Sequence, residues 1–312
     1  MQSNSWQTAR TALLTLILAS GCGSPLVLDD DGALVSIPHE TGSQGHIIVE
    51  AMINDQGPFK FALDTGASMS IIFDQTREKA GLDIDNDKRV LIAGTVGIGD
   101  FPVSNIASLD VGSESWTNAP VASLPALDDI PLEIDGILGI DFLSRYAVGV
   151  SPGDQVVRLY PPTVVSERSY WGWTSIPMQQ LQIGEGGASA YTINLYVGDV
   201  TIPALLDLGA GTNLMNWNAA RALRIRPKRS GNTNRIFGAI GVVPVITQLD
   251  VEQLMIETIQ VRNRTFFVSD FSIFEVLGLE DRPAAIVGPG LFKEREFVID
   301  FERNRMLLRS GK

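Results

Sequence analysis

The chain has 312 residues, which is enough for one large or two medium domains with proper hydrophobic cores. It carries 24 Lys and Arg residues against 36 Asp and Glu residues, so its net charge is −12. No basic cluster with interleaved aromatic residues offsets this charge, and we therefore exclude nucleic acid as a partner, because its phosphates would be repelled. Apolar residues make up 45% of the chain, as in a folded globular protein.

Cysteine and histidine are scarce in this sequence. Cys22 is the single cysteine, and His39 and His46 are the two histidines. Disulfides, histidine-based metal sites and a Ser-His-Asp triad are therefore not expected, and we predict neither a metal nor another cofactor. Both histidines precede the first predicted strand, and we interpret them as solvated linker residues.

Residues 1–22 have the pattern of a secretory signal peptide. The apolar run ALLTLILA at 12–19 is far shorter than the ~20 residues that span a bilayer, and it fits a signal h-region. Its ending, LASGC, resembles the lipobox of bacterial lipoproteins, which implies lipidation at Cys22. A cleaved signal with an incidental cysteine is the alternative.

Residues 23–45 are rich in Ser, Gly, Asp and Pro and are predicted to form a flexible tether. By resemblance to Gram-negative lipoproteins, Ser24 implies sorting to the outer membrane. We therefore expect a protein of the bacterial cell envelope that is lipid-anchored on the periplasmic face or secreted.

From residue 46 onward, short apolar or alternating segments are separated by Gly, Asp, Asn and Pro, which favours strands. The most informative segment is FALDTGAS at 61–68, where Asp64 ends an alternating apolar run. Taken alone, this segment is most simply a turn after a strand, because Asp, Thr, Gly and Ser all form turns.

The same pattern recurs later in the chain. ALLDLG at 204–209 matches FALDTG at 61–66, and the offset is 143 residues. A short helix-like stretch follows each copy, with Asp74 and Asn216 as the predicted N-caps.

A second pair of segments supports an internal duplication. GILGIDFL at 136–143 matches AIVGPGLF at 285–292, a hairpin follows each, and Gly-rich hairpins at 93–103 and 237–245 precede them. A long period that occurs twice indicates two related lobes and not a solenoid. The predicted parts are an N-terminal lobe at 46–165, an inter-lobe connection at 166–189 and a C-terminal lobe at 190–312.

In this order and in two copies, the motifs resemble those of the retropepsin and pepsin clan of aspartic proteases. FALDTGAS resembles the catalytic motif, and GILGIDFLSRY resembles the apolar-apolar-Gly signature that packs beneath it. The resemblance implies an all-β fold of two homologous retropepsin-like β-barrel lobes with short helices, related by a pseudo-twofold axis, with the active-site cleft between them. It also implies a monomeric aspartic endopeptidase that acts on a peptide or protein substrate.

Asp64 and Asp207 match the catalytic pair of this clan. Two carboxyl groups so close together cannot both ionise, so one acts as general base on a shared water and the other polarises the substrate carbonyl. The residues that match supporting positions of the two catalytic loops are Thr65, Gly66, Ser68, Gly209 and Thr212. The candidate flap residues are Gly94, Gly97, Gly99, Gly238 and Gly241.

The second copy departs from the pattern of the clan. Leu208 replaces a hydroxyl residue whose side chain bonds across the lobes, and Gly211 replaces the second hydroxyl. We therefore predict an asymmetric dyad in which Asp207 is the protonated member. Because of these departures, the alternative function is that of a non-catalytic envelope lipoprotein that retains the fold and a peptide-binding groove. The third interpretation is an unrelated β-rich secreted domain.

Overall fold

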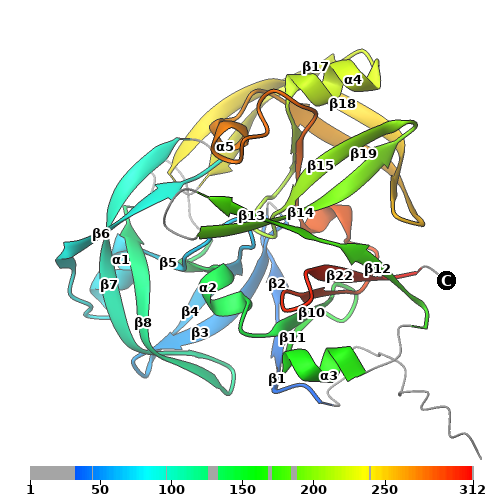
Figure 1. Ribbon diagram of the computed structural model, residues 1–312. Helices are drawn as coiled ribbons and strands as arrows, with labels where there is room; N and C mark the ends of the chain where they lie inside the picture. Colours follow the sequence, from blue (N-terminus) through cyan, green and yellow to red (C-terminus); the bar gives the residue numbers. More distant parts are fainter. Residues whose placement is uncertain are drawn as a thin grey trace, which may run out of the picture.

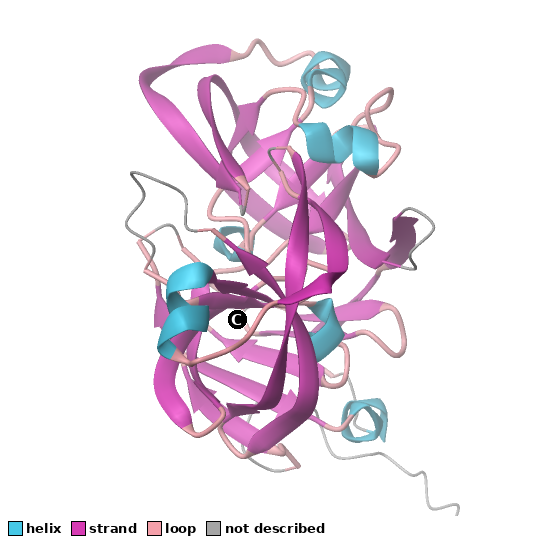
Figure 2. Cartoon of the chain, turned by 90° about the vertical axis from the view of Figure 1, so that its left-hand side faces the viewer, coloured by secondary structure: helices cyan, strands magenta, loops and turns pink. Residues whose placement is uncertain are grey.

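Strands dominate the computed structural model, and its helices are short (Figure 2). The predicted signal peptide and Cys22 lie outside the described residues. Within the described part of the chain, no helix is long and apolar enough to cross a membrane. The structure describes residues 32–43, 45–95, 97–125, 133–167, 171–183, 188–238 and 240–310.

Eight strands form the sheet of the N-terminal lobe. They are β2 (Glu40–Thr41), β3 (Ile47–Ile53), β4 (Gln56–Leu63), β5 (Ile71–Phe73), β6 (Asp85–Ala93), β7 (Ile98–Val111), β8 (Glu114–Leu124) and β9 (Gly136–Leu138). Their order in the sheet is β2-β3-β4-β9-β5-β8-β7-β6. An additional pairing of β3 with β7, in which Met52 lies opposite Asp110, closes the sheet into a barrel (Figure 1).

Eight further strands form the sheet of the C-terminal lobe. They are β13 (Gln179–Ile183), β14 (Ala188–Val197), β15 (Val200–Leu206), β16 (Asn213–Met215), β17 (Lys228–Gly238), β18 (Gly241–Ile256), β19 (Ile259–Val268) and β20 (Ala285–Val287). The order β13-β14-β15-β20-β16-β19-β18-β17 repeats that of the first lobe strand for strand, and Tyr196 opposite Met255 closes the barrel. The predicted fold of two related all-β lobes is confirmed.

A six-stranded sheet joins the two lobes. Its members are β1 (Val35–Pro38), β10 (Ala147–Ser151), β11 (Val156–Tyr160), β12 (Trp173–Pro177), β21 (Phe297–Asp300) and β22 (Arg305–Arg309). The order is β1-β11-β10-β21-β22-β12, so the terminal hairpin of each lobe lies beside that of the other. The two hairpins meet where β10 pairs antiparallel with β21 and Ala147 lies opposite Asp300.

The segments on either side of the N-terminal lobe are more ordered than the sequence suggested. Residues 35–41 of the expected tether lie in β1 and β2, because VSIP at 35–38 alternates and buries Ile37 in the core. His39 is also buried, with 8% of its surface exposed, so its interpretation as a solvated linker residue was wrong. Strands β12 and β13 lie within the expected connection at 166–189.

The helices connect the strands. They are α1 (Asp74–Lys79), α2 (Ile140–Leu143), α3 (Pro162–Glu167), α4 (Trp217–Leu223), α5 (Ser272–Val276) and the 3-10 helix η1 (Pro289–Leu291). Asn216 caps α4 as predicted, since its side chain accepts a hydrogen bond from the Ala219 N–H at 2.8 Å. Asp74 is instead the first residue of α1, and the N-cap residue, Phe73, makes no side-chain cap.

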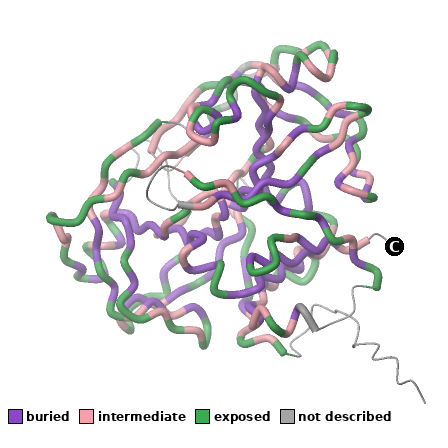
Figure 3. Tube along the Cα trace, viewed as in Figure 1, coloured by how far each residue is buried: buried purple, intermediate pink, exposed green. Residues whose placement is uncertain are grey.

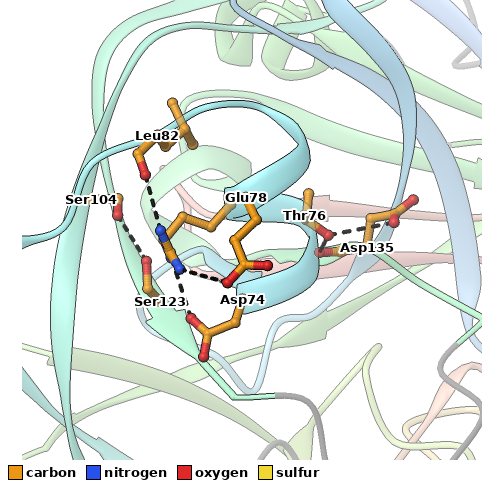
Figure 4. A network of polar contacts seen from close by, with 8 residues as sticks. Asp74, Thr76, Glu78, Leu82, Ser104, Ser123 and Asp135 are labelled. Atoms are coloured by element: carbon orange, nitrogen blue, oxygen red, sulfur yellow. Dashed lines mark hydrogen bonds and ion pairs between the residues drawn. The ribbon is translucent and has the colours of Figure 1, made fainter.

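A polar network fixes α1 against the strands that carry the site (Figure 4). The Thr76 hydroxyl donates to the Asp135 carbonyl at 2.7 Å, and the Lys60 N–H donates to the Asp135 carboxylate at 2.8 Å. Asp135 immediately precedes β9, and these bonds therefore hold α1 and β4 to the start of β9. In the same view, the hydroxyls of Ser104 and Ser123 lie 2.9 Å apart and join β7 to β8.

The buried residues fill the interior of both lobes and the sheet between them (Figure 3). One apolar cluster includes Leu63 at the end of β4, Leu206 at the end of β15 and Ile299 of the joining sheet. Because one core reaches all three sheets, the strand ends that present the two aspartates have fixed positions relative to each other.

Candidate active site

Each predicted catalytic aspartate follows the end of a buried strand. Asp64 follows β4, and Asp207 follows β15 at the equivalent place. The Asp64 N–H donates to the Leu138 carbonyl and the Asp207 N–H donates to the Val287 carbonyl, both at 3.0 Å. Strands β9 and β20, which carry the apolar-apolar-Gly segments, therefore lie beneath the two aspartate loops.

Glycine at the second position after each aspartate lets the two loops approach closely. A Cβ atom on Gly66 would lie 2.7 Å from the carboxyl carbon of Asp207, and one on Gly209 would collide with the carboxyl group of Asp64. The contacts are reciprocal, as the pseudo-twofold relation requires. Any side chain at either glycine would push the two carboxyl groups apart.

The two carboxyl groups are hydrogen-bonded to each other, with Asp207 as the donor. Burial, followed by the negative charge of Asp64, raises the pKa of Asp207 well above its usual range. Burial raises the pKa of Asp64 as well, but the hydrogen bond from Asp207 and the N–H groups of Gly66 and Ala67, at 2.7 and 3.0 Å from its Oδ1, oppose that rise. The N–H groups of Gly209, at 2.8 Å from its Oδ1, and of Ala210 oppose the rise at Asp207 in the same way, so backbone donors do not distinguish the two carboxyl groups. We assign the shared proton to Asp207 from the direction of the hydrogen bond between the carboxyl groups and from the position of His46 beside Asp64.

The hydroxyl of Thr65 makes the contact between the two aspartate loops. The Thr65 Oγ1 donates to the Leu206 carbonyl at 2.6 Å and accepts from the Leu208 N–H at 3.0 Å. Leu208 occupies the equivalent position of the second loop, and its side chain is fully buried in the main core. The second half of the contact is thus replaced by apolar packing, which keeps the lobes together without a second hydroxyl.

The other predicted supporting residues lie at the cleft surface. Ser68 and Thr212 are exposed, and both line the cleft between the lobes. The carboxylate of Asp64 accepts hydrogen bonds from the backbone N–H groups of Gly66 and Ala67.

Ser70 supports the first loop, and the sequence reasoning did not select it. Its hydroxyl accepts from the Gly139 N–H at 3.0 Å and donates to Asp141 at 2.7 Å. In the second lobe the Asn213 side chain accepts from the Gly288 N–H at 3.4 Å. The same 143-residue offset relates Ser70 to Asn213, so a residue-by-residue comparison of the two copies could have found this pair.

His46 was also missed, and the interpretation of it as a solvated linker residue was wrong. The residue is half-buried, lines the cleft, and hydrogen-bonds through its ring to the backbone carbonyl of Gly209. Burial is the largest influence on its pKa and lowers it, whereas the charge of Asp64 acts in the opposite direction. A titratable imidazole ring therefore lies beside the dyad.

Each lobe contributes a hairpin with residues that line the cleft, formed by β6 and β7 in one lobe and by β17 and β18 in the other. At the first tip the Gly94 N–H donates to the Gly97 carbonyl at 3.0 Å, and at the second Gly238 lies opposite Gly241. Gly94 and Gly238 line the cleft, whereas Gly99 lies in β7 against the ring of Phe101.

The two tips reach across the cleft. The Gly97 N–H donates to the Ser272 hydroxyl of the C-terminal lobe at 2.9 Å, and that hydroxyl also contacts the Thr95 carbonyl at 3.4 Å. Ile240 at the tip of the second hairpin packs against an apolar cluster of the N-terminal lobe that includes Phe73 and Ile137. Each hairpin is therefore fixed by the opposite lobe.

The space beneath the hairpins has a volume of about 710 Å³. Asp64 and Asp207 both line it, together with apolar side chains of the two lobes, among them Phe73 and Leu214. It is large enough for several side chains of an extended ligand.

Comparison with known proteins agrees with this geometry. Residues 49–145 match the family model described as gag-polyprotein putative aspartyl protease. A crystal structure of aspartic proteinase from Irpex lacteus superposes with a TM-score of 0.57 at 12% sequence identity, covering 89% of this chain and 97% of that one. No match was found among curated protein sequences.

The chain has the fold of the pepsin and retropepsin clan. The resemblance inferred from the sequence is confirmed, and the family match together with this pepsin-like fold supports a protease-like function. The family match covers the N-terminal lobe, and the similarity of fold covers both lobes.

The raised pKa of Asp207 predicts how the stability of the folded protein changes with pH. Because its folded pKa lies above its unfolded one, the stability it contributes is present at acidic pH and is lost as the pH rises through the folded pKa. An Asn side chain stays neutral, so Asp207→Asn should raise Tm near neutral pH by roughly 1–2 °C, the shift produced by ~1 kcal/mol in a chain of this size. Thermal denaturation at acidic pH should show a much smaller gain.

The control for this experiment is Asp154→Asn, which changes an exposed turn residue. Its Tm should follow that of the unmodified protein at both pH values. An equal gain for Asp207→Asn at acidic and neutral pH would show that the raised pKa is not the cause.

The contact between Gly97 and Ser272 predicts how the first hairpin moves. Ser272→Ala removes the acceptor of the Gly97 N–H, and one such hydrogen bond contributes about 1 kcal/mol. The Gly97 amide should then exchange its hydrogen about fivefold faster, as measured by NMR. Ser113→Ala removes a hydroxyl whose partner is the Leu34 carbonyl and should leave Gly97 unchanged; equal rates in all three proteins would contradict the contact.

Proposed function

We propose that this protein is an aspartic endopeptidase in which Asp64 and Asp207 activate a water molecule. The observation that carries the proposal is the hydrogen-bonded pair of carboxyl groups, one from each lobe, in a cleft beneath two hairpins. A buried pair that shares one proton provides a general base and a general acid at the same time.

The hydrolysis would begin with Asp64 as the base. Asp64 takes a proton from the water as the water oxygen bonds to the substrate carbonyl carbon, and Asp207 gives its proton to the carbonyl oxygen. The resulting gem-diol then collapses: a proton passes from Asp64 to the amide nitrogen, the C–N bond breaks, and a diol proton returns to Asp207. The products are a carboxylic acid and an amine, and the dyad is left with its single proton.

The substrate of this reaction would be an extended peptide with apolar side chains. The cleft presents apolar side chains from both lobes, including Ile92 and Ile273. The two hairpins supply strands close to the cleft, and an extended peptide can add to such strands through its main chain while its side chains alternate between pockets. The closed hairpins would exclude water from the reacting centre.

The proposed location is the bacterial cell envelope, with a lipid anchor at Cys22 and an outer-membrane, periplasmic position. It is supported by the apolar run at 12–19 and the LASGC ending, and secretion is the alternative. In either location we propose that the protein is a monomer. A membrane-attached protease of this kind would meet its peptide substrates outside the cytoplasm.

The anchor can be tested by fractionating bacterial cells that express the full chain. Cys22→Ser removes the thiol that would carry the lipid, so the protein should move from the membrane fraction to the soluble fraction. Asp29→Asn, which leaves Cys22 in place, should remain with the membranes. Retention of the Cys22→Ser variant in the membrane fraction would rule out this anchor.

The peptidase reaction can be tested with a mixed peptide library from about pH 3 to about pH 8, with cleavage followed by mass spectrometry. Asp64→Asn and Asp207→Asn should each lower kcat/KM by about 10²–10⁴-fold, because each removes one member of the acid–base pair. An inhibitor with a hydroxyl group in place of the scissile carbonyl should block the reaction. Asp154→Asn, in an exposed turn, should cleave normally.

Two outcomes would reject the proposal in different ways. Cleavage that survives either dyad substitution would show that another group does the chemistry. Peptide binding without cleavage by the unmodified protein would favour the non-catalytic protein with a peptide-binding groove, for which the missing hydroxyl at Leu208 is the supporting observation.

A further inference from the structure

His46 lies in the turn between β2 and β3, and several contacts fix that turn. The Gly42 N–H donates to the His46 carbonyl at 3.0 Å, and the Gly45 N–H donates to the Gly42 carbonyl at 2.8 Å. On the other side, the Glu133 carboxylate accepts a hydrogen bond from the Ser43 N–H at 2.8 Å. The backbone of His46 is therefore held in place at the edge of the cleft.

The ring of His46 contacts the catalytic loop of the opposite lobe. Its hydrogen-bond partner is the carbonyl of Gly209, the residue whose missing side chain makes room for the Asp64 carboxyl group. A Cβ atom on Gly45 would lie 3.8 Å from the Gly211 carbonyl, so Gly45 and His46 both lie against the same loop. The Gly209 peptide thus contacts the His46 ring on one side and the Asp64 carboxyl group on the other.

The charged groups that act on His46 are carboxylates. Asp64 and Glu133 both raise its pKa, and the Gly209 carbonyl acts in the same direction, but burial is the larger influence and leaves the pKa lowered. Two further charged groups act on these carboxylates. Asp207 is hydrogen-bonded to Asp64, and the charge of Lys60 lowers the pKa of Glu133. His46 is therefore neutral near neutral pH and gains its proton in acid, where it lowers the pKa of Asp64.

This histidine has no counterpart at the second aspartate. Strand register places Ile48 opposite Ala62, and Thr192 opposite Leu205, which are equivalent pairs in the two lobes. Two residues before Thr192 the second lobe has Ala190, which is buried in a separate apolar cluster. The cation therefore acts on one side of the dyad alone.

We propose that His46 is a positioning residue that holds the Gly209 loop against Asp64 and, once protonated, keeps Asp64 ionised under acidic conditions. This role rests on the proposed peptidase function. It assigns His46 two separable tasks, a hydrogen bond to the opposite loop and a positive charge beside the base. The consequence is that catalysis extends to lower pH than the carboxyl pair alone would allow.

The contact can be tested without any peptidase activity, by following the ring protons of both histidines by NMR as the pH is changed. Asp64→Asn removes the negative charge that favours the protonated ring, so the midpoint of the His46 titration should move to lower pH. His39, which lies in the chain segment between β1 and β2 and not in the cleft, should keep its midpoint. His39→Gln assigns the two signals.

The catalytic role can be tested with the pH dependence of kcat/KM. His46→Gln removes the charge and keeps a hydrogen-bond donor, so on the acidic limb kcat/KM should fall about fivefold, while the alkaline limb stays in place. His46→Phe removes both the charge and the donor and should in addition lower kcat at the optimum. His39→Gln should reproduce the unmodified profile, and a role limited to stability would leave the shape of the profile unchanged in every variant.

The outcomes separate the two hypotheses. A His46 midpoint that does not respond to Asp64→Asn overturns the proposal, whether or not the protein cleaves peptides. An acidic limb that His46→Gln leaves in place overturns the catalytic role. A midpoint that responds, in a protein that cleaves no peptide, supports the coupling of His46 to Asp64 and rejects only the peptidase function.

Discussion

The hydrogen bond between Asp64 and Asp207 is the interaction on which the site depends, and it is set by how closely two backbones can approach. Each carboxyl group occupies the space in which the glycine of the opposite loop would carry a side chain. At this separation two negative charges cannot coexist in a buried place, and one proton must remain. Two backbone N–H groups act on each carboxyl group, so we assign the proton to Asp207 because protonated His46 lies beside Asp64 and stabilises the charge of Asp64 alone.

The close approach in turn requires that the lobes cannot slide past each other. Thr65 supplies the single hydroxyl contact between the two loops, and Leu208 supplies buried apolar area where a second hydroxyl would stand. A leucine side chain contributes about 1.5–3 kcal/mol when it is buried, which is comparable to or larger than the ~1 kcal/mol of an average hydrogen bond. The unusual second loop therefore weakens the symmetry of the site without weakening the junction of the lobes.

The sequence predicted those features that local pattern and duplication encode. Two copies of an apolar strand ending in Asp-x-Gly, each followed by an apolar-apolar-Gly segment, were enough to predict two related all-β lobes and the positions of the aspartates. Asn216 was predicted as a cap because capping depends on neighbouring residues.

What the sequence did not predict depends on contacts between distant residues. His46 was missed because its partner, Gly209, lies in the other lobe and no local pattern marks the contact. The ordered part of the tether was missed for the same reason, since β1 is stabilised by pairing with β11, more than a hundred residues away. Asp74 was misassigned because the preference of a residue for helix ends does not fix the residue at which the helix begins.

The pairing of β10 with β21 has a consequence for how the chain folds. Each half contributes a hairpin to one shared sheet. An isolated half would expose the backbone N–H and C=O groups of β10 or of β21 as an open edge. Such an edge pairs with any available strand, so a separated half would associate with other copies of itself. The two lobes are thus one cooperative unit: a cut in the connection between them would leave a noncovalent complex, and neither half would persist as a free domain.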